Sequence, residues 1–341
     1  MNLQERKEIL RQLGAYLLTD DPEWQVTKER AVTENAWFIP EFVELAARNI
    51  ANQFLTAESL RQLIDRYRIP AENSSPKKVG IVMAGNIPMV GFHDLLCTFI
   101  TGHKAMIKLS SKDTVLIKFF IKKLIEWNPG AADYLVVSEM LKGCDAYIAT
   151  GSNNSSAYFT YYFSKYPHII RQNRTSVAIL TGNESTEELE SLADDVYQFF
   201  GLGCRNVTKL FVPEGYDFQP LLQIFSKYNH LADHHKYKNN YDYNLAILLL
   251  NKRYFMSNES LLLVEDPSHF SRIGQLHYEF YKNIDDVRAG LLDNQIIQCV
   301  VSTEDVHFGR AQYPAICDYA DGVDTIDFLL NLGTEHEVRK S

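Results

Sequence analysis

The sequence has 341 residues, which is enough for about two domains. Its composition, with 46% hydrophobic and 23% charged residues, is typical of a globular protein and excludes a disordered or fibrous chain. The formal net charge of −9 gives no general attraction to nucleic acid or anionic lipid, so we expect no nucleic-acid partner.

The cysteines and the first residues favour a reducing compartment. The five cysteines are odd in number, widely spaced and contain no CxxC pair, which argues against a disulfide framework and against a zinc knuckle. The start MNLQERKEIL carries charges where a signal peptide would have its apolar core, and no stretch reaches the roughly 18 uninterrupted apolar residues of a membrane helix. We therefore expect a cytoplasmic protein with no metal site and no membrane span.

Residues 1–70 carry helical signals. Pro40 suits the first turn of a helix, apolar residues follow it at helical spacing, and Thr56 can cap the next helix. The polar segment AENSSPKK, which contains Pro76, then separates this region from a different pattern. We predict the first organisational boundary of the chain at this segment.

From Lys78 onward, short apolar strands alternate with longer helical segments. The strands are KVGIVMAG, AMIKL and DAYIAT, and the segments between them include VGFHDLLCTFI and TVLIKFFIKKLIEW. A second unit starts at SVAIL (176–180), continues with a helix from Thr186 to Gly201, and reaches the strand TKLFV (208–212). This alternation predicts an α/β fold with parallel sheets covered on both faces.

A cysteine in a glycine-rich turn is the most pointed chemical feature. In GLGCRN (201–206), Cys204 lies between a helix end and a buried strand, close to Arg205. A nucleophilic cysteine needs access and a lowered pKa, and such a turn can offer both. The alternative is a small buried hydrophobic residue, which is the usual role of an unbridged cysteine.

A second feature is the turn after the strand in VGIVMAGNIPMVG (79–91). Ligands bind at the carboxyl ends of strands in open α/β sheets, and Asn86 follows such an end. Its side-chain amide could face a developing oxyanion, or Asn86 could be an ordinary turn residue. The segment is neither a GxGxxG fingerprint nor a Walker A loop.

Together with AMIKLSSKD (105–113), ATGSNN (149–154) and QFFGLGCRN (198–206), this segment resembles the aldehyde dehydrogenase superfamily. The similarity is closest to the acyl-CoA reductases of the bacterial-luminescence fatty acid reductase type, and ENAWFIPEF and DYADGVDTIDFLLNL extend it over nearly the whole chain. The resemblance implies catalytic roles for Cys204 and Asn86, and cofactor binding by Lys108, Ser110, Ser111, Gly151 and Ser152.

The resemblance also implies the architecture. We expect an aldehyde-dehydrogenase-like α/β fold, in which two parallel-sheet domains have the active site between them. Residues 1–170 would form the helical N-terminus and cofactor domain, and residues 171–315 the catalytic domain. A C-terminal tail, residues 316–341, would return to the cofactor domain or to a partner subunit. We further expect a homo-oligomer.

The sequence departs from the superfamily where hydrolytic members carry a Glu that activates water. No Asp or Glu occurs between Pro167 and Thr181, so the acyl-enzyme should react slowly with water. The later Glu-x-Phe-Gly-Pro motif is also unclear, and Glu279 in HYEFY is too weak a candidate to include in the site.

Two polar segments remain open. His230 and His234 have the i, i+4 spacing of a metal pair, but no third ligand is indicated, so a polar surface or an acyl-CoA contact is favoured for His230, Asp233, His234 and His235. KYKNNYDYN (236–244) suits either recognition of coenzyme A phosphates and adenine or a solvated loop.

The resemblance thus implies NADPH-dependent reduction of an acyl thioester such as acyl-CoA to an aldehyde, through an acyl-cysteine at Cys204. NADPH is expected, with NADH as the alternative, because Ser111 replaces the acid that NAD-preferring members often carry three residues after the ribose-binding lysine. An aldehyde dehydrogenase or semialdehyde-type reductase that uses the same cysteine is the first alternative. A non-catalytic binding protein of the same fold is the second.

Overall fold

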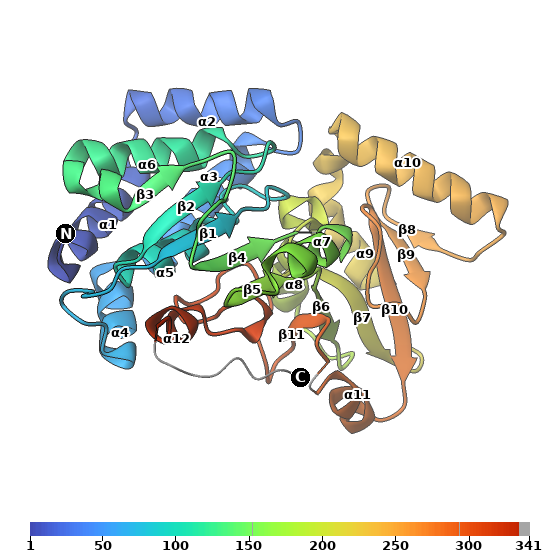
Figure 1. The fold of residues 1–341 in the computed structure, drawn as a ribbon. Helices are drawn as coiled ribbons and strands as arrows, with labels where there is room; N and C mark the ends of the chain where they lie inside the picture. The colour runs from blue at the N-terminus through green and yellow to red at the C-terminus, as the bar shows by residue number, and fades with distance from the viewer. Residues whose placement is uncertain (152, 293, 334–341) are drawn as a thin grey trace. The chain divides into compact units, whose positions relative to one another are not determined.

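The structure is a computed structural model that describes residues 1–151, 153–292 and 294–333 (Figure 1). The chain forms two compact units, which we call unit 1 and unit 2. Unit 1 comprises Met1–Gln172 and Ala315–Ser341, and unit 2 comprises Asn173–Pro314. Among the described residues, no helix has both the length and the apolar character that crossing a membrane requires.

Unit 1 begins with helices, as the spacing in residues 1–70 predicts. They are α1 (Leu3–Leu17), α2 (Pro22–Glu34), α3 (Pro40–Asn49), the short η1 (Ile50–Phe54) and α4 (Ala57–Tyr67). Local sequence starts each of them: Asn2 and Glu5 form a capping box for α1, and Asp21 caps α2 in front of a proline. Thr56 caps α4 through the backbone N–H of Ser59.

The sheet of unit 1 has five strands in the order β3-β2-β1-β4-β5, and every neighbouring pair is parallel. The strands are β1 (Lys78–Val82), β2 (Lys104–Lys108), β3 (Leu135–Val137), β4 (Ala146–Thr150) and β5 (His168–Arg171); the connections contain α5 (Phe92–Ile100), α6 (Val115–Trp127), η2 (Pro129–Asp133) and α7 (Asn153–Phe163). The chain moves outward from β1 to β3 and then returns to β4 on the other side of β1. The strand order therefore reverses between β1 and β4, which is where open α/β sheets bind ligands.

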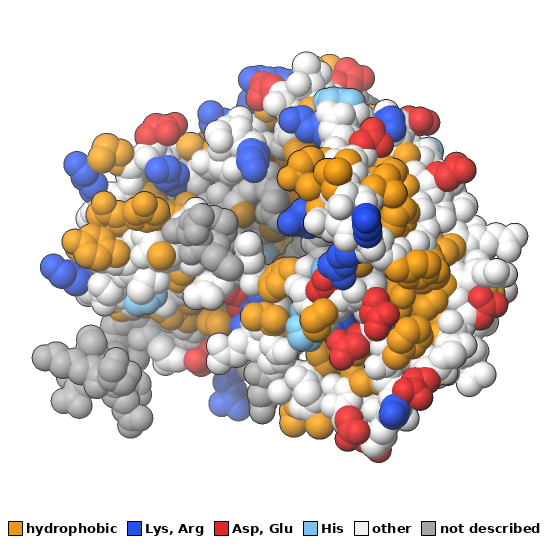
Figure 2. Space-filling view, turned by 90° about the vertical axis from the view of Figure 1, so that its right-hand side faces the viewer, with side chains coloured by type: hydrophobic (Ala, Val, Ile, Leu, Met, Phe, Trp, Pro, Cys, Tyr) orange, Lys and Arg blue, Asp and Glu red, His pale blue; other side chains and the backbone are white. Residues whose placement is uncertain are grey.

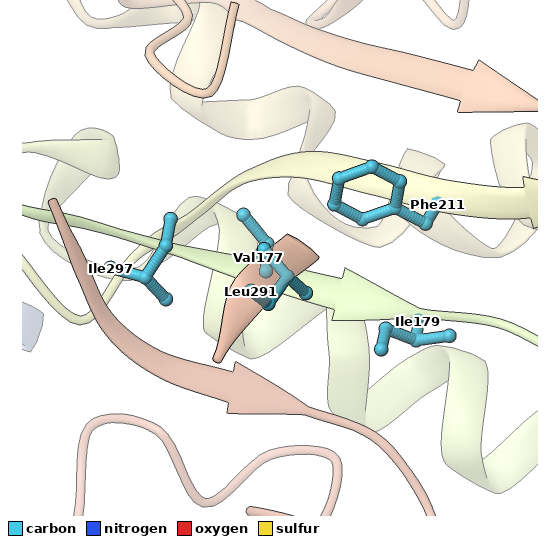
Figure 3. Packing of buried hydrophobic residues seen from close by; sticks show 5 residues of the cluster. All are labelled: Val177, Ile179, Phe211, Leu291 and Ile297. Carbon is cyan, nitrogen blue, oxygen red and sulfur yellow. The ribbon is translucent and has the colours of Figure 1, made fainter. Parts of the chain in front are cut away.

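Unit 2 contains a six-stranded sheet in the order β11-β6-β7-β10-β9-β8, which is parallel except for the short antiparallel pair β8–β9. The strands are β6 (Thr175–Ile179), β7 (Val207–Pro213), β8 (Met256–Ser257), β9 (Leu262–Glu265), β10 (Gln275–Tyr281) and β11 (Ile297–Val301). The helices are α8 (Thr186–Tyr197), η3 (Gln198–Gly201), α9 (Gln219–Phe225), η4 (Ser226–Asp233), α10 (His235–Leu250) and α11 (Ile284–Leu291). Figure 3 shows one apolar cluster of this unit, in which side chains of β6, β7 and β11 meet Leu291 of α11.

The C-terminal segment from Ala315 contains η5 (Ala320–Gly322) and α12 (Thr325–Leu330), and it packs on unit 1. Arg171, at the end of β5, is 3% exposed, and its Nη2 lies 2.7 Å from Asp94 Oδ1 of α5. The same guanidinium donates to the Thr325 hydroxyl, at 2.8 Å, and to the Ala320 carbonyl oxygen. One buried cation therefore anchors the C-terminal segment to α5 and β5.

Candidate active site

The Asn86 turn follows β1 at the carboxyl edge of the unit 1 sheet. The Met83 N–H donates to the Lys108 carbonyl oxygen at 3.0 Å, so the chain stays paired with β2 just before the turn begins. At Gly85 an added Cβ would lie 2.6 Å from Ser110 Oγ, which only glycine avoids. Asn86 itself is half-buried. The turn is thus packed closely against the loop that follows β2.

The predicted cofactor residues of unit 1 lie at the same edge. In the register of the sheet, Val82 of β1 is opposite Lys108 of β2 and Ala149 of β4, so the three strand ends are level. Lys108 and Ser111 are exposed, Ser110 and Gly151 are half-buried, and Ser152 lies outside the described residues. The structure therefore brings Asn86, Lys108, Ser110, Ser111 and Gly151 together where the strand order reverses.

Cys204 lies in unit 2, in the turn between η3 and β7. The predicted helix up to Gly201 is wrong at its end, because α8 stops at Tyr197 and Phe199, Phe200 and Gly201 all have positive φ, at 54°, 56° and 72°. Three successive residues with positive φ reverse the chain sharply before the cysteine. Cys204 is half-buried and forms no disulfide. The residue is therefore partly accessible to solvent.

Asn206 organises this turn and was not singled out by the sequence analysis. It is fully buried, and its Oδ1 accepts the Gly203 N–H at 2.8 Å. Its Nδ2 donates to the carbonyl oxygens of Asp195, at 3.0 Å, and Gln198, at 2.8 Å. The side chain thus occupies carbonyls that a continuing helix would have used, which explains the early end of α8. The sequence signal was an asparagine two residues after the cysteine, directly before the apolar strand β7.

Ser176 and Cys299 support the same turn from β6 and β11. The Ser176 hydroxyl donates to the Cys204 carbonyl oxygen at 3.0 Å and lies 3.1 Å from Cys299 Sγ, while the Cys299 N–H donates to it at 3.2 Å. Burial raises the pKa of Cys299, which keeps this thiol protonated and a poor nucleophile. Cys97, in contrast to the half-buried Cys299, is fully buried, and burial raises its pKa too.

Asp195, on α8, holds the segment that follows β11. Its two carboxylate oxygens accept the Gly309 N–H at 2.6 Å and the Ala311 N–H at 3.0 Å. Because the side chain is completely buried, its pKa is raised to about 7. Burial therefore opposes ionisation of this carboxyl group, and the two N–H donors favour it.

The structure shows no acid on the described strands where hydrolytic superfamily members carry their water-activating Glu, and it shows Glu279 in an ion pair. β5 and β6 carry no carboxylate, and Arg171 at the end of β5 is paired with Asp94. Glu279, on β10, forms an ion pair with the buried Lys209, whose Nζ also donates to the Pro267 carbonyl oxygen at 2.7 Å. Glu279 therefore neutralises a buried cation, which is a structural role.

The histidine segment forms no metal centre in the described part of the chain. No group of three or more His, Cys, Asp and Glu side chains that could hold a metal occurs among the described residues. The His234 ring packs on Phe200, with 4.7 Å between ring centroids, and so covers part of the sharp reversal before Cys204. KYKNNYDYN forms the first part of α10 and is not a loop.

Comparison with solved structures identifies the fold. A succinic semialdehyde dehydrogenase from Streptococcus pyogenes, in complex with NADP+, superposes with a TM-score of 0.65 at 15% identity over 88% of this chain and 76% of that chain. A lactaldehyde dehydrogenase from Escherichia coli gives 0.64 at 14% identity over 86% and 72%. A NAD-dependent aldehyde dehydrogenase from Sinorhizobium meliloti gives 0.64 at 12% identity over 88% and 70%. The fold is that of the aldehyde dehydrogenases.

The family follows from the sequence. The model of the acyl-CoA reductase (LuxC) family matches residues 46–221, which is more than half of the chain and includes Asn86, Lys108 and Cys204. The chain therefore belongs to the LuxC acyl-CoA reductases, and it is an oxidoreductase of acyl and aldehyde groups. No curated protein matches it by sequence.

Proposed function

We propose that this protein reduces an acyl thioester, such as acyl-CoA, to an aldehyde with NADPH. The observation that carries the proposal is Cys204, a half-buried thiol in a sharply reversed turn pinned by Asn206 inside the family-matched segment. Reactive cysteines are partly exposed and lie in electropositive surroundings, and Arg205 follows Cys204 directly.

The Cys204 thiolate attacks the thioester carbonyl, and the coenzyme thiolate leaves as the acyl group is transferred to sulfur. The side-chain amide of Asn86 and the backbone N–H of Cys204 stabilise the oxyanion that forms at the carbonyl. When bound, NADPH supplies the hydride that reduces the acyl-cysteine carbon. Hydride addition would leave a tetrahedral alkoxide on the Cys204 sulfur, which expels the Cys204 thiolate and releases the aldehyde.

The residues at the carboxyl edge of the unit 1 sheet fit a dinucleotide. Lys108 is an exposed cation, Ser110 and Ser111 add hydroxyl groups, and Gly151 adds no side chain at the adjacent strand end. Ser111 and Lys112 share a small cavity with Glu34 of α2, but the Glu34 carboxylate lies 2.7 Å from Arg30 Nε. The same cavity is also lined by the buried Asp113, so its charges nearly balance, and the exposed Lys112 beside Ser111 is the feature that favours a 2′-phosphate.

The first alternative, oxidation of an aldehyde to a free acid, requires a base that activates water against the acyl-cysteine. The described strands β5 and β6 carry none, and the buried guanidinium of Arg171 lies at the end of β5. We therefore propose that thioester reduction is faster than acid formation. The second alternative, a non-catalytic binding protein, would require an unreactive Cys204.

We also propose a homo-oligomer. Apolar side chains are exposed on the face of unit 2 that carries α10 (Figure 2), where Tyr243, Leu249, Leu250 and Tyr254 have exposed fractions of 60 to 78%. Clusters of exposed apolar side chains are typical of interaction surfaces. Light scattering of the purified protein tests this point, and a monomeric mass would contradict it.

The function is tested by NADPH oxidation with acyl-CoA of increasing chain length. The matched control is Cys317→Ala, because Cys317 is a half-buried cysteine of the C-terminal segment. We expect turnover in the wild type and in Cys317→Ala, none in Cys204→Ala, and slower NADP-dependent oxidation of the corresponding aldehyde. Turnover in Cys204→Ala, or acid formation as fast as aldehyde formation, would reject the proposal.

A further inference from the structure

The Asn86 turn ends at a residue with an unfavourable backbone conformation. Met89 has φ of 57°, in the left-handed region that non-glycine residues avoid. Its carbonyl oxygen accepts the N–H of Phe92, the first residue of α5, at 2.9 Å. Met89 thus joins the turn to α5, and its conformation has to be imposed by contacts from elsewhere in unit 1.

Asp113 provides such a contact. Its side chain is buried, with the residue only 5% exposed, and Oδ2 accepts the Met89 N–H at 2.6 Å. The backbone N–H of Leu116, in the first turn of α6, partly offsets the rise in the Asp113 pKa that burial causes. The carboxylate therefore connects the end of the Asn86 turn with the segment that leads into α6.

The backbone of Asp113 contacts the cofactor loop, which we define as residues 108–111. The Asp113 N–H donates to the Ser110 carbonyl oxygen at 3.1 Å, and the Ser110 hydroxyl accepts the Lys112 N–H at 3.2 Å. Ser110 Oγ in turn packs against Gly85, at the beginning of the Asn86 turn. The two loops are thus joined at Gly85 and at Met89, one on each side of Asn86.

We propose that Asp113 is a positioning residue that holds the Asn86 turn in register with the cofactor loop. Packing alone makes the contact at Gly85, whereas the contact at Met89 depends on an acceptor at position 113. Loss of this acceptor frees Met89 to leave the left-handed region, and the Asn86 amide moves with it. A displacement of about 1 Å in a catalytic group can cost about 10²-fold in rate. The inference rests on the proposed function, because it takes Asn86 as the residue that stabilises the oxyanion.

Three replacements separate the acceptor from the fold. Asp113→Asn keeps an oxygen that can accept the Met89 N–H. Asp113→Ala removes it, and Asp113→Ser keeps a short oxygen near the start of α6 that does not reach Met89, so this variant carries the test if the alanine variant does not fold. The matched control is Asp145→Ala, because Asp145 Oδ2 accepts the Lys78 N–H at 2.8 Å at the opposite end of β1.

The experiment combines hydrogen exchange of the peptide covering residues 83–91 with kinetics per titrated Cys204 thiol. In both Asp113→Ala and Asp113→Ser we expect hydrogen exchange to become about tenfold faster and kcat to fall about tenfold. KM for acyl-CoA should stay within about threefold of the wild-type value. Asp113→Asn and Asp145→Ala should stay within about threefold of the wild type in both measurements.

Unchanged exchange in Asp113→Ala and Asp113→Ser would overturn the inference, and so would an equal loss in Asp113→Asn. Faster exchange without a fall in kcat would overturn it as well, because the turn would then move without consequence for the reaction. Failure of the proposed function is a distinct result, since the wild type itself would then not oxidise NADPH with acyl-CoA.

Discussion

Replacement of Asn206 by alanine is expected to destabilise unit 2 and to release the turn that carries Cys204. The side chain is completely buried and makes two hydrogen bonds of 2.8 Å and one of 3.0 Å, to Gly203, Gln198 and Asp195. Its further bond to the Val196 carbonyl oxygen, at 3.4 Å, is weak and is not counted.

The magnitude follows from the groups left behind. The buried N–H of Gly203 would lose its acceptor, which costs about 2 kcal/mol, and two backbone carbonyls would lose a donor at about 1 kcal/mol each. The expected loss is therefore about 4 kcal/mol, a large part of the roughly 5 to 15 kcal/mol that stabilises a typical domain. Asn206→Asp should cost at least as much, because its second oxygen would face the carbonyls of Asp195 and Gln198.

Urea unfolding of the wild type and both variants measures the free energy of unfolding. The rate at which a thiol reagent labels Cys204 under native conditions reports on the turn itself, and it should rise in Asn206→Ala. Asn128→Ala is the control, because Asn128 also accepts a backbone N–H, from Gly130 at 3.0 Å, but is only half-buried. Stabilities of both Asn206 variants within about 0.5 kcal/mol of the wild type would refute this reasoning.

Three further predictions concern Arg171, Asp195 and Ser111. Arg171→Ala leaves Asp94 buried and unpaired and should cost about 3 to 5 kcal/mol in urea unfolding; a loss below about 1 kcal/mol would contradict the anchoring role. The pKa of Asp195, raised by burial to about 7, means that its contribution to stability is present at low pH and is lost as pH rises toward and through 7. Asp195→Asn should therefore flatten the fall in wild-type Tm between about pH 4 and 7, and an unchanged slope would contradict the assignment. Ser111→Glu should shift the ratio of kcat/KM for NADPH over NADH toward NADH by about tenfold or more, because a carboxylate repels the 2′-phosphate; an unchanged ratio would exclude Ser111 from that position.

The strand and helix pattern was readable from the sequence because parallel sheets buried on both faces leave continuous apolar strands between helices. The same pattern placed the turn residues Asn86 and Ser111 correctly after β1 and β2. The early end of α8 was not predictable from helix propensity. It depends on the side-chain amide of Asn206, which bonds to the carbonyl oxygen of Gln198, eight residues earlier in the chain.

Contacts between distant segments were likewise hidden. Arg171 pairs with Asp94 and with Thr325, which are 77 and 154 residues away. Contacts over such distances produce no sequence pattern from which they could be predicted. The role of Asp113 depends on the left-handed backbone conformation of Met89, and this conformation cannot be predicted because methionine does not favour it. These residues show themselves only once the packing is known.

The central claim is that Cys204 carries the acyl group, and peptide mass mapping of the acyl-enzyme tests it most directly. Wild-type protein is incubated with acyl-CoA in the absence of cofactor, digested and mapped, and NADPH is added to a second sample before digestion. The account predicts a single acyl modification on the peptide that contains Cys204, its loss with release of aldehyde after NADPH, and no modification in Cys204→Ala. An acyl group on any other residue, or modification that persists in Cys204→Ala, would contradict it.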